Sequence, residues 1–273
     1  MRRTVLKLLL LSVAAALVAA CSGGNDSTTT PEPDSATASG NCPSDGDASA
    51  GSDAIPLKEA KLNIEHNATD NDTGFQGFID SEGWERLDAL GPDGTVLTFC
   101  GRGDLGQLGL TELFFESVEP ANADVPIEEV LQTLPEGNYT FSGKAMESGE
   151  SAGTTSGTAR LTHDIPAGPA LISPAAGAVV TTTGVLASWG PVTKTITGED
   201  VNIIAYQLII EKDEDPHPHM IGKIGLSMYL PASVTSIAVP DGFLEPGTPY
   251  SWEVLAIEES GNQTLSSGEF QTQ

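Results

Sequence analysis

The fold is decided by three stretches near the C-terminus: Val185-Leu-Ala-Ser-Trp189-Gly-Pro191, Tyr206-Gln-Leu-Ile-Ile210 and Tyr250-Ser-Trp-Glu-Val-Leu-Ala256. In each stretch apolar side chains alternate with other residues, which is the period of a strand with one buried face. Turn residues such as Pro240-Asp-Gly242 and Glu245-Pro-Gly247 separate the stretches. Short strands without a long amphipathic helix predict a β-sandwich.

In their order and spacing, these stretches resemble strands B, C and F of a fibronectin type III domain covering residues 168–273. The resemblance implies that Tyr250 is a corner tyrosine, with its ring in the core and its hydroxyl bonded back to the preceding loop. It also implies core positions for Trp189, Tyr206 and Trp252. Domains of this family act as spacers or interaction scaffolds for many unrelated partners, so the resemblance names no partner.

The middle region, residues 56–167, shows a weaker form of the same pattern. Residues 84–90 and 95–100 flank a Gly-Pro-Asp-Gly turn, which predicts a hairpin, and residues 110–115 are typical of another strand. One helix is expected over residues 126–134, where a proline stands in the first turn and apolar residues share one face.

An internal similarity links the two regions. Leu134-Pro-Glu-Gly-Asn-Tyr139-Thr-Phe141 parallels the stretch from Leu244 to Trp252: in both, the tyrosine is followed by an aromatic residue after two positions, an alanine after six and a glutamate after eight. This predicts that Tyr139 is a second corner tyrosine in a second sandwich. A shared turn and strand without a shared fold is the alternative. The expected fold class is therefore all-β, with two tandem β-sandwich domains of the immunoglobulin or fibronectin III kind after a disordered tether.

The N-terminus has the pattern of an export signal, with a charged segment up to Lys7 and an apolar segment too short to span a bilayer. Val18-Ala-Ala-Cys21 then resembles the bacterial lipobox. This implies that residues 1–20 are removed and that Cys21 carries a diacylglyceryl group and palmitate. Ser22 stands where such lipoproteins carry their sorting residue and favours the outer membrane. An ordinary signal peptide cut near a chance cysteine is the alternative.

The segment after the lipidation site, residues 21–55, is expected to be a disordered tether. Between Ser22 and Ile55 it holds six acidic residues, no Lys or Arg, and a single large aliphatic residue, Ile55. It cannot bury enough apolar surface to offset the entropy of ordering. As a flexible coil it would span about 30–35 Å, which would hold the folded part away from the membrane.

The charge of the chain excludes some partners. The formal net charge is −26, and loss of Arg2, Arg3 and Lys7 with the signal makes it more negative. A nucleic-acid partner is excluded, since binding one needs a basic surface. The same negative charge opposes electrostatic attachment to anionic lipid. The membrane is expected to be reached only through the lipid on Cys21.

With Cys21 committed to lipid, two cysteines remain, Cys42 in the tether and Cys100 at the end of an expected strand. A Cys42–Cys100 bridge is permitted in an oxidising envelope. Two unpaired thiols, with Cys100 buried as a small hydrophobic residue, are an equal alternative.

Two stretches offer metal ligands. Asn67, Asp70 and Asp72 place oxygen atoms in one loop, which favours Ca²⁺, although the spacing is not that of an EF-hand. A solvated acidic turn capped by its own side chains is the alternative. His217 and His219 beside carboxylates could ligate a transition metal weakly, but a polar loop is the simpler interpretation. No other cofactor is expected.

Two motifs suggest activities that their context does not support. Gly149-Glu-Ser151-Ala-Gly153 matches the nucleophile elbow of α/β-hydrolases but lacks the following helix and the parallel sheet. Arg102-Gly-Asp104 matches the tripeptide of integrin ligands but is equally a plain turn. No nucleophile, base and orienting group occur at plausible spacing, so a non-enzyme is expected.

The sequence thus favours a lipid-anchored, non-catalytic binding or structural protein of the bacterial envelope, whose partner is an unknown envelope protein or a polysaccharide. Polysaccharide binding would use exposed aromatic rings, and Trp84 together with Phe75 on one open face is the candidate. A calcium-binding module is a further alternative.

Overall fold

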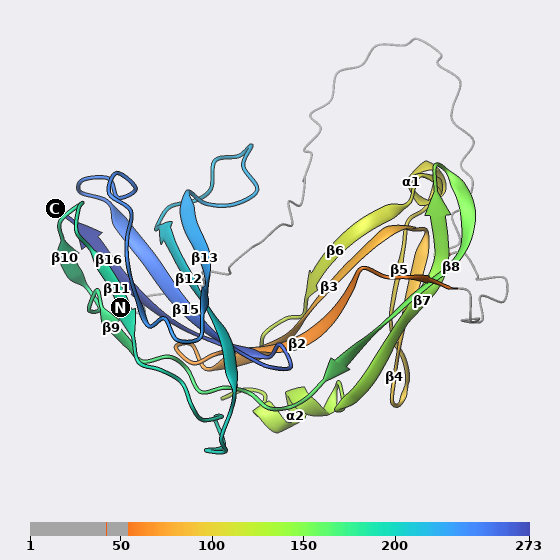
Figure 1. Ribbon diagram of the computed structural model, residues 1–273, viewed down its shortest axis with the longest axis horizontal. Helices are drawn as coiled ribbons and strands as arrows, with labels where there is room; N and C mark the ends of the chain where they lie inside the picture. Colours follow the sequence, from red (N-terminus) through yellow and green to blue (C-terminus); the bar gives the residue numbers. More distant parts are fainter. Residues whose placement is uncertain (1–41, 43–53) are drawn as a thin grey trace, which may run out of the picture.

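The computed structural model describes Cys42 and residues 54–273, and this part of the chain is nearly all β (Figure 1). The expected signal, the lipidation site and most of the expected tether lie outside the described residues. No helix in residues 54–273 is long and apolar enough to cross a membrane.

The first domain is a sandwich of two sheets joined at one point. The elements are β1 (Ile55–Pro56), β2 (Glu59–Asn67), β3 (Asp72–Trp84), β4 (Arg86–Gly91), β5 (Gly94–Cys100), α1 (Gly103–Leu108), β6 (Leu110–Glu116), α2 (Ile127–Gln132), β7 (Gly137–Glu147) and β8 (Glu150–Leu161). One sheet has the order β1-β8-β7-β4-β5 and the other β2-β3-β6. They meet where Trp84 of β3 pairs with Ala145 of β7. The core between them includes Ile64, Ile79 and Phe141, all fully buried.

The second domain is a fibronectin type III-like sandwich. Its strands are β9 (Leu171–Ser173), β10 (Ala178–Val180), β11 (Leu186–Trp189), β12 (Ile203–Lys212), β13 (Gly225–Pro231), β14 (Ser236–Ala238), β15 (Pro249–Glu258) and β16 (Gln263–Thr272). A three-stranded sheet, β14-β11-β9, packs on β16-β15-β12-β13 through one apolar core. The stretches compared with strands B, C and F are β11, β12 and β15. The all-β expectation with sandwich domains is confirmed.

Both sandwiches contain a tyrosine whose hydroxyl is bonded to the turn before its strand. The Tyr250 hydroxyl accepts a hydrogen bond from Glu245 N at 2.8 Å, and the Tyr139 hydroxyl donates to the Pro135 carbonyl at 2.7 Å. Both residues are fully buried. The opposite direction of the two bonds shows that similar sequences reach the same anchoring of turn to strand through different backbone groups.

We expect Tyr250→Phe to lower the free energy of unfolding by about 1 kcal/mol, because the ring stays in the core while Glu245 N loses its acceptor. Chemical denaturation of the two proteins measures the difference. Tyr229→Phe is the control, since Tyr229 is 71% exposed and its change should leave the midpoint unmoved. Equal midpoints for Tyr250→Phe and wild type would contradict a stabilising corner bond.

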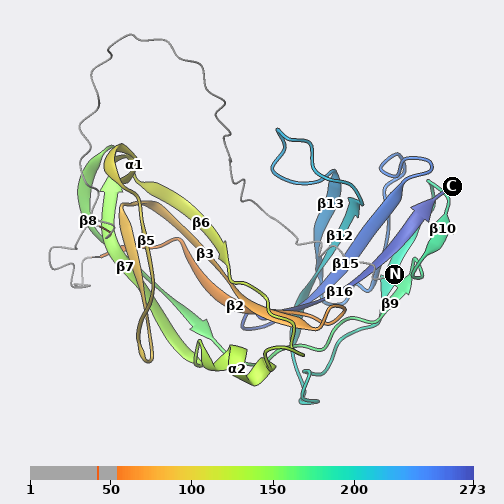
Figure 2. The same ribbon diagram turned by 180° about the vertical axis from the view of Figure 1, so that it is seen from behind.

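The two sandwiches share a sheet. Residues Glu65–Asn67 of β2 pair in parallel with Gln263–Leu265 of β16, so strands run without interruption in the order β6-β3-β2-β16-β15-β12-β13. The pairing continues beyond the ladder, where Ala68 N donates to the Leu265 carbonyl at 2.9 Å. Figures 1 and 2 show the result: the two domains form the arms of a U, and this sheet lines its inner side. We call that inner side the concave face.

Asn262 fixes the bottom of the U. Its side chain is 1% exposed, and its Oδ1 accepts a hydrogen bond from Ile64 N of the first domain at 2.8 Å. Its Nδ2 donates to the carbonyl oxygens of Thr162 and Asp164 in the connecting segment, at 3.0 and 3.1 Å. The Glu258 carboxylate holds the turn that carries Asn262, accepting from Asn262 N at 3.1 Å. One amide therefore joins the second domain to both the first domain and the connection.

Some expected boundaries differ in the structure. Ile55 is expected in the tether but is part of β1, which pairs with β8. It is the one large aliphatic residue of the tether segment, and it pairs with the edge of β8. Trp84 was placed in the hairpin strand but ends β3 instead, where it pairs with Leu110. The expected helix is shorter, beginning after Pro126 and ending at Gln132. The connection between the domains passes from the first core at Ile165 to the second at Ala167.

Candidate functional site

A groove of about 680 Å³ occupies the concave face. Its walls come from both domains because alternate residues of each strand point away from the sandwich cores. In β15, for example, Trp252 and Val254 are buried in the core, whereas Leu255 lies in the groove. The apolar part of the lining is formed mainly by Phe78, Phe114, Ile209, Tyr229 and Leu255.

A chain of hydrogen bonds crosses the floor of the groove where the domains meet. Gln263 Nε2 donates to Glu65 Oε2 across the shared pairing of β2 and β16. Gln263 Nε2 also donates to Gln76 Oε1 at 2.9 Å, and Gln76 Nε2 donates to Glu116 Oε1 at 2.9 Å. Strands β16, β2, β3 and β6 are therefore joined through two amides and two carboxylates.

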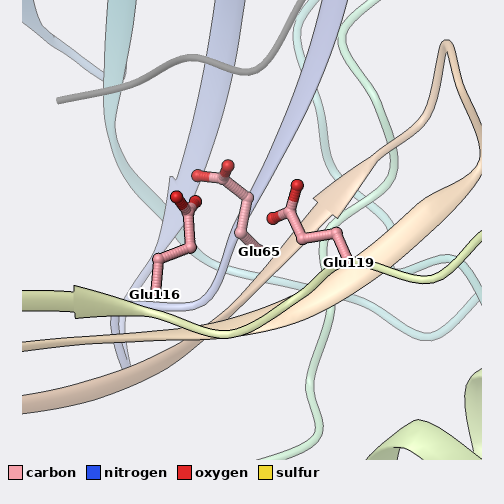
Figure 3. A group of neighbouring side chains, drawn as sticks. All are labelled: Glu65, Glu116 and Glu119. Atoms are coloured by element: carbon pink, nitrogen blue, oxygen red, sulfur yellow. The ribbon is translucent and has the colours of Figure 1, made fainter. Parts of the chain in front are cut away.

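A third carboxylate lies beside this chain. Figure 3 shows the side chains of Glu65, Glu116 and Glu119 directed to the same region, from β2, from the end of β6 and from the segment after it. Carboxylate oxygens of the three lie within 4.8 Å of one another. Glu65 is only 6% exposed, and Glu116 is the most exposed of the three.

Burial changes the acidity of this group. Loss of hydration raises the pKa of Glu65 to about 7, despite the hydrogen bonds from Gln263 and Gln76 that favour its charged form. The pKa of Glu119 is raised to about 8 by burial and then by the negative charges of Glu65 and Glu116. At neutral pH the group therefore holds protons that exposed glutamates would have released.

A second acidic position lies on the same face, on β15. Burial raises the pKa of Glu253 to about 8, and repulsion from Glu211 on β12 adds to the effect. Two oxygens on this face, Glu119 Oε1 and Glu253 Oε2, are buried and accept no hydrogen bond. Carboxylates in this condition are stabilised either by a proton or by a positively charged group placed against them.

Asn67, Asp70 and Asp72, which are expected to hold calcium, do not belong to the group of Glu65, Glu116 and Glu119. Asn67 Oδ1 instead accepts hydrogen bonds from Thr69 N and Asp70 N, at 2.9 and 3.0 Å, which is the self-capped turn given as the alternative. Asp72 is 9% exposed, and its carbonyl contacts Nδ1 of the buried His66 at 3.0 Å. Calcium binding by Asn67, Asp70 and Asp72 stays a prediction, which a calcium-dependent rise in melting temperature would test.

The aromatic residues proposed for sugar binding are not on an open face. Trp84 is fully buried and Phe75 is 5% exposed, and both pack in the first core. The register of β3 turns Phe75 and Ile79 inward and leaves Gln76 and Phe78 on the concave face. An irregularity in the strand between Asp80 and Trp84 shifts this register and places Trp84 on the core side as well. The expectation that these two rings stack on a polysaccharide was therefore wrong.

Ser151 of the hydrolase motif lies far from His163, the residue that would have to act as its base. Ser151 lies at the tip of the β7–β8 hairpin, whereas His163 follows the other end of β8 and contacts the Leu134 carbonyl at 2.9 Å. Ten residues of extended strand, roughly 33 Å, separate Ser151 from the end of β8 at Leu161. The fold does not bring Ser151 and His163 together.

The other singled-out residues lie on loops or at a crosslink. Arg102 precedes α1, so Arg102-Gly103-Asp104 opens a short helix rather than a plain turn. His217 Nδ1 accepts a hydrogen bond from His219 N at 3.2 Å in an exposed loop. Cys42 and Cys100 form a disulfide, which ties the segment before β1 to the end of β5. The structure therefore contains the disulfide and not the two unpaired thiols given as the alternative.

The expected core residues are all buried. Trp189 and Tyr206 contact each other edge to face with ring centroids 5.6 Å apart, and the Tyr206 hydroxyl accepts a hydrogen bond from Val192 N at 2.8 Å. Tyr250 stacks on Phe270 at 5.5 Å. Trp252 is 1% exposed and Tyr139 fully buried. Of these residues, Tyr206, Tyr250 and Trp252 lie on β12 and β15, whose opposite sides form part of the concave face.

Sequence reasoning missed the residues of the groove floor, which are Glu65, Gln76, Glu116 and Gln263, and the carboxylates of Glu119 and Glu253 on the same face. Alternation in residues 59–67 and 250–256 marks which side chains point outward. It does not show that the outward sides of two domains face one another, because the β2–β16 pairing joins residues almost 200 positions apart.

The chain matches no protein-family model and no curated protein sequence. Among solved structures, it is similar to a computationally redesigned β-sandwich protein, at 20% identity and a TM-score of 0.28, over 41% of this chain and 96% of that one. It is also similar to the FN1–FN3 domains of chicken CNTN1, at 13% identity and a TM-score of 0.32, over 81% of this chain and 65% of that one. This chain thus spans just under two thirds of the chicken structure.

Proposed function

We propose that this protein is a lipid-anchored, non-catalytic binding or scaffold protein of the bacterial envelope, and that the concave face is its binding surface. The observation that carries the binding role is the shared sheet: strand pairing and Asn262 hold the two domains as a U whose inner side has no partner among the described residues. Clefts between domains are preferred places for ligands.

The anchoring part of the proposal is supported by Val18-Ala-Ala-Cys21 and the charged and apolar segments before it. Lipid on Cys21 would place the U at a membrane surface, with Ser22 favouring the outer membrane. The non-catalytic part is supported by the distance between Ser151 and His163, the one nucleophile and base that the sequence suggested.

The anchor is tested by expressing the full chain with its own signal in a bacterial host and measuring the mass of the processed protein. We expect a diacylglyceryl and acyl addition on Cys21 and recovery with membranes. Cys21→Ser should give an unmodified protein, and Ser22→Ala should still be lipidated. A wild-type N-terminus downstream of Cys21 without lipid would contradict the anchor.

The binding surface is tested by crosslinking in the native envelope. A photoreactive amino acid replaces Tyr229 on the concave face or Ile172 on β9, whose side chains are 71% and 61% exposed. We expect a discrete crosslinked species from position 229 and none from position 172. Equal capture from both positions would contradict a specific role for the concave face.

A further inference from the structure

The concave face has more carboxyl groups than basic side chains to pair with them. Carboxylates stand on four of its strands: Glu116 on β6, Glu65 on β2, Glu253 on β15 and Glu211 on β12. Among the described residues, the cationic side chains near these carboxylates are Lys61 and Arg160, which line the groove, and Lys223, whose charge acts on Glu211 and Glu253. The Lys61 ammonium is already engaged by Glu59 at 3.4 Å. The carboxylates of this surface therefore have few positively charged side chains to pair with.

Two atoms show where donors are missing. Glu119 Oε1 and Glu253 Oε2 are inaccessible to solvent and accept no hydrogen bond within the described chain. A buried acceptor without a donor destabilises the protein, because it has lost its bond to water and gained none in return. Ammonium and guanidinium groups supply both the charge and the N–H donors that these two carboxylates lack.

The walls of the groove suit an organic cation better than a metal ion. The ring of Phe78 already carries an ammonium, since Lys61 Nζ lies 5.9 Å from its centroid. Phe114 and Tyr229, 40% and 71% exposed, stand on the two arms. The groove of about 680 Å³ is more than ten times the roughly 30 Å³ that one water molecule occupies. A single ion would leave the apolar walls and most of the carboxylates untouched.

The spacing of the carboxylates favours a chain-like ligand. Neighbouring strands are about 4.8 Å apart, so acidic positions on β6, β2, β15 and β12 of the shared sheet are spread over most of its width. A ligand that contacts all of these acidic positions must carry several linked cationic groups. The apolar residues between them, Ile209 and Leu255, offer contacts for aliphatic side chains, which a peptide has and a polyamine does not.

We propose that the concave face binds an extended peptide segment of another protein in which Lys or Arg residues are interspersed with apolar residues. Its cationic groups contact Glu253 and the Glu65–Glu116–Glu119 group, and its apolar side chains contact Phe78, Phe114 and Tyr229. A second copy of this chain is disfavoured by its net charge of −26. The inference rests on the proposed binding role and names the class of partner.

The test uses the full chain after signal removal and a fluorescent twelve-residue peptide with the repeat Lys-Lys-Leu-Leu, which places both residue types on each side of an extended chain. Fluorescence anisotropy in 150 mM salt measures the dissociation constant. Three further probes isolate each feature: the same peptide with Glu in place of Lys, with Ser in place of Leu, and spermine as a competitor.

We expect saturable binding of the Lys-Leu peptide, no binding of the Glu peptide, and at least about tenfold weaker binding of the Lys-Ser peptide and of spermine. Glu253→Gln and Tyr229→Ala should each weaken the Lys-Leu peptide about tenfold. Glu128→Gln is the matched control, because Glu128 lies on α2 outside the groove; it should change the affinity less than twofold. Circular dichroism establishes that each variant is folded.

Unchanged affinity in both groove variants would overturn the proposal, and so would spermine binding as tightly as the peptide, which would mean a small-cation site. Failure of this inference is distinguishable from failure of the proposed function. If Tyr229 still crosslinks specifically in the envelope while no cationic peptide binds, the groove has a partner of another chemistry. If neither occurs, the binding role itself is wrong.

Discussion

Replacing Asn262 with alanine is expected to lower the free energy of unfolding by about 4 kcal/mol, among the largest effects of any single polar substitution in this chain. Three backbone groups lose their partner at once: the buried Ile64 N and the part-buried carbonyls of Thr162 and Asp164. An unsatisfied buried group costs about 1–3 kcal/mol, and a part-buried one costs less because water can reach it. Chemical denaturation followed by tryptophan fluorescence measures the loss.

The same variant should open the U. Asn262 is the amide that links the second domain to β2 and to the connecting segment, and the parallel pairing beside it covers only Glu65–Asn67 and Gln263–Leu265. Small-angle scattering should therefore give a larger radius of gyration, while the two sandwich cores, which Asn262 does not join, stay folded.

Asn202→Ala is the matched control for this prediction. Asn202 also bonds across the second domain, from Nδ2 to Glu259 Oε2 at 2.9 Å, but this bond is exposed. Water replaces its partners, so we expect a loss below about 1 kcal/mol and an unchanged radius. Asn262→Ala behaving like Asn202→Ala would mean that strand pairing and the bonds of Gln263 hold the domains together without Asn262.

The fold of each domain could be predicted because its signals are local. Alternation around Trp189, Tyr206 and Trp252 gives the strands and their buried sides, and the spacing to Tyr250 gives the corner. Such patterns report whether a side chain faces its own core. They were misleading for Trp84. The pattern gives it no clear core position and so makes it a candidate for ligand binding, whereas in the structure it is the last residue of β3 and is fully buried.

The candidate site could not be predicted, because it depends on contacts between domains. Glu65 and Gln263 are ordinary outward-facing residues of strands in their own domains, and only the parallel pairing of β2 with β16 brings them together and buries Glu65. The role of Asn262 also depends on a contact between the domains. In the sequence it is a turn residue after Gly261, and nothing there indicates that its side chain reaches Ile64. Nonlocal burial gives these polar residues their properties.

Glu65 carries the second large prediction, in the pH dependence of stability. Its ordinary pKa of 4.5 is raised in the folded protein to about 7, with burial as the main cause. Between these two values the folded state binds more protons than the unfolded state, so stability falls as pH rises. The penalty is absent below about pH 4.5 and complete above about pH 7, where it is on the order of 3 kcal/mol for this carboxylate.

Glu119 and Glu253 shift in the same direction, with pKa values raised to about 8, so the wild-type protein should become more stable as pH falls from 8.5 to 5. Other groups on this face enter the balance: Glu116 and Asp72 repel Glu65, Glu211 repels Glu253, and Lys223 partly offsets that repulsion. Thermal melts in buffers of constant ionic strength measure the trend.

Glu65→Gln isolates the contribution of one carboxylate. A glutamine keeps the shape and can still accept from Gln263, but it carries no charge to desolvate. We expect the variant to be more stable than wild type by up to about 3 kcal/mol at pH 8.5 and equal to it near pH 4.5, since both side chains are then neutral. The pH slope between 5 and 7 should be correspondingly smaller in the variant. Glu128→Gln, on the exposed side of α2, should leave the slope unchanged. A variant that is less stable than wild type at pH 8.5 would mean that the groove stabilises the charged form of Glu65, and that burial does not raise its pKa.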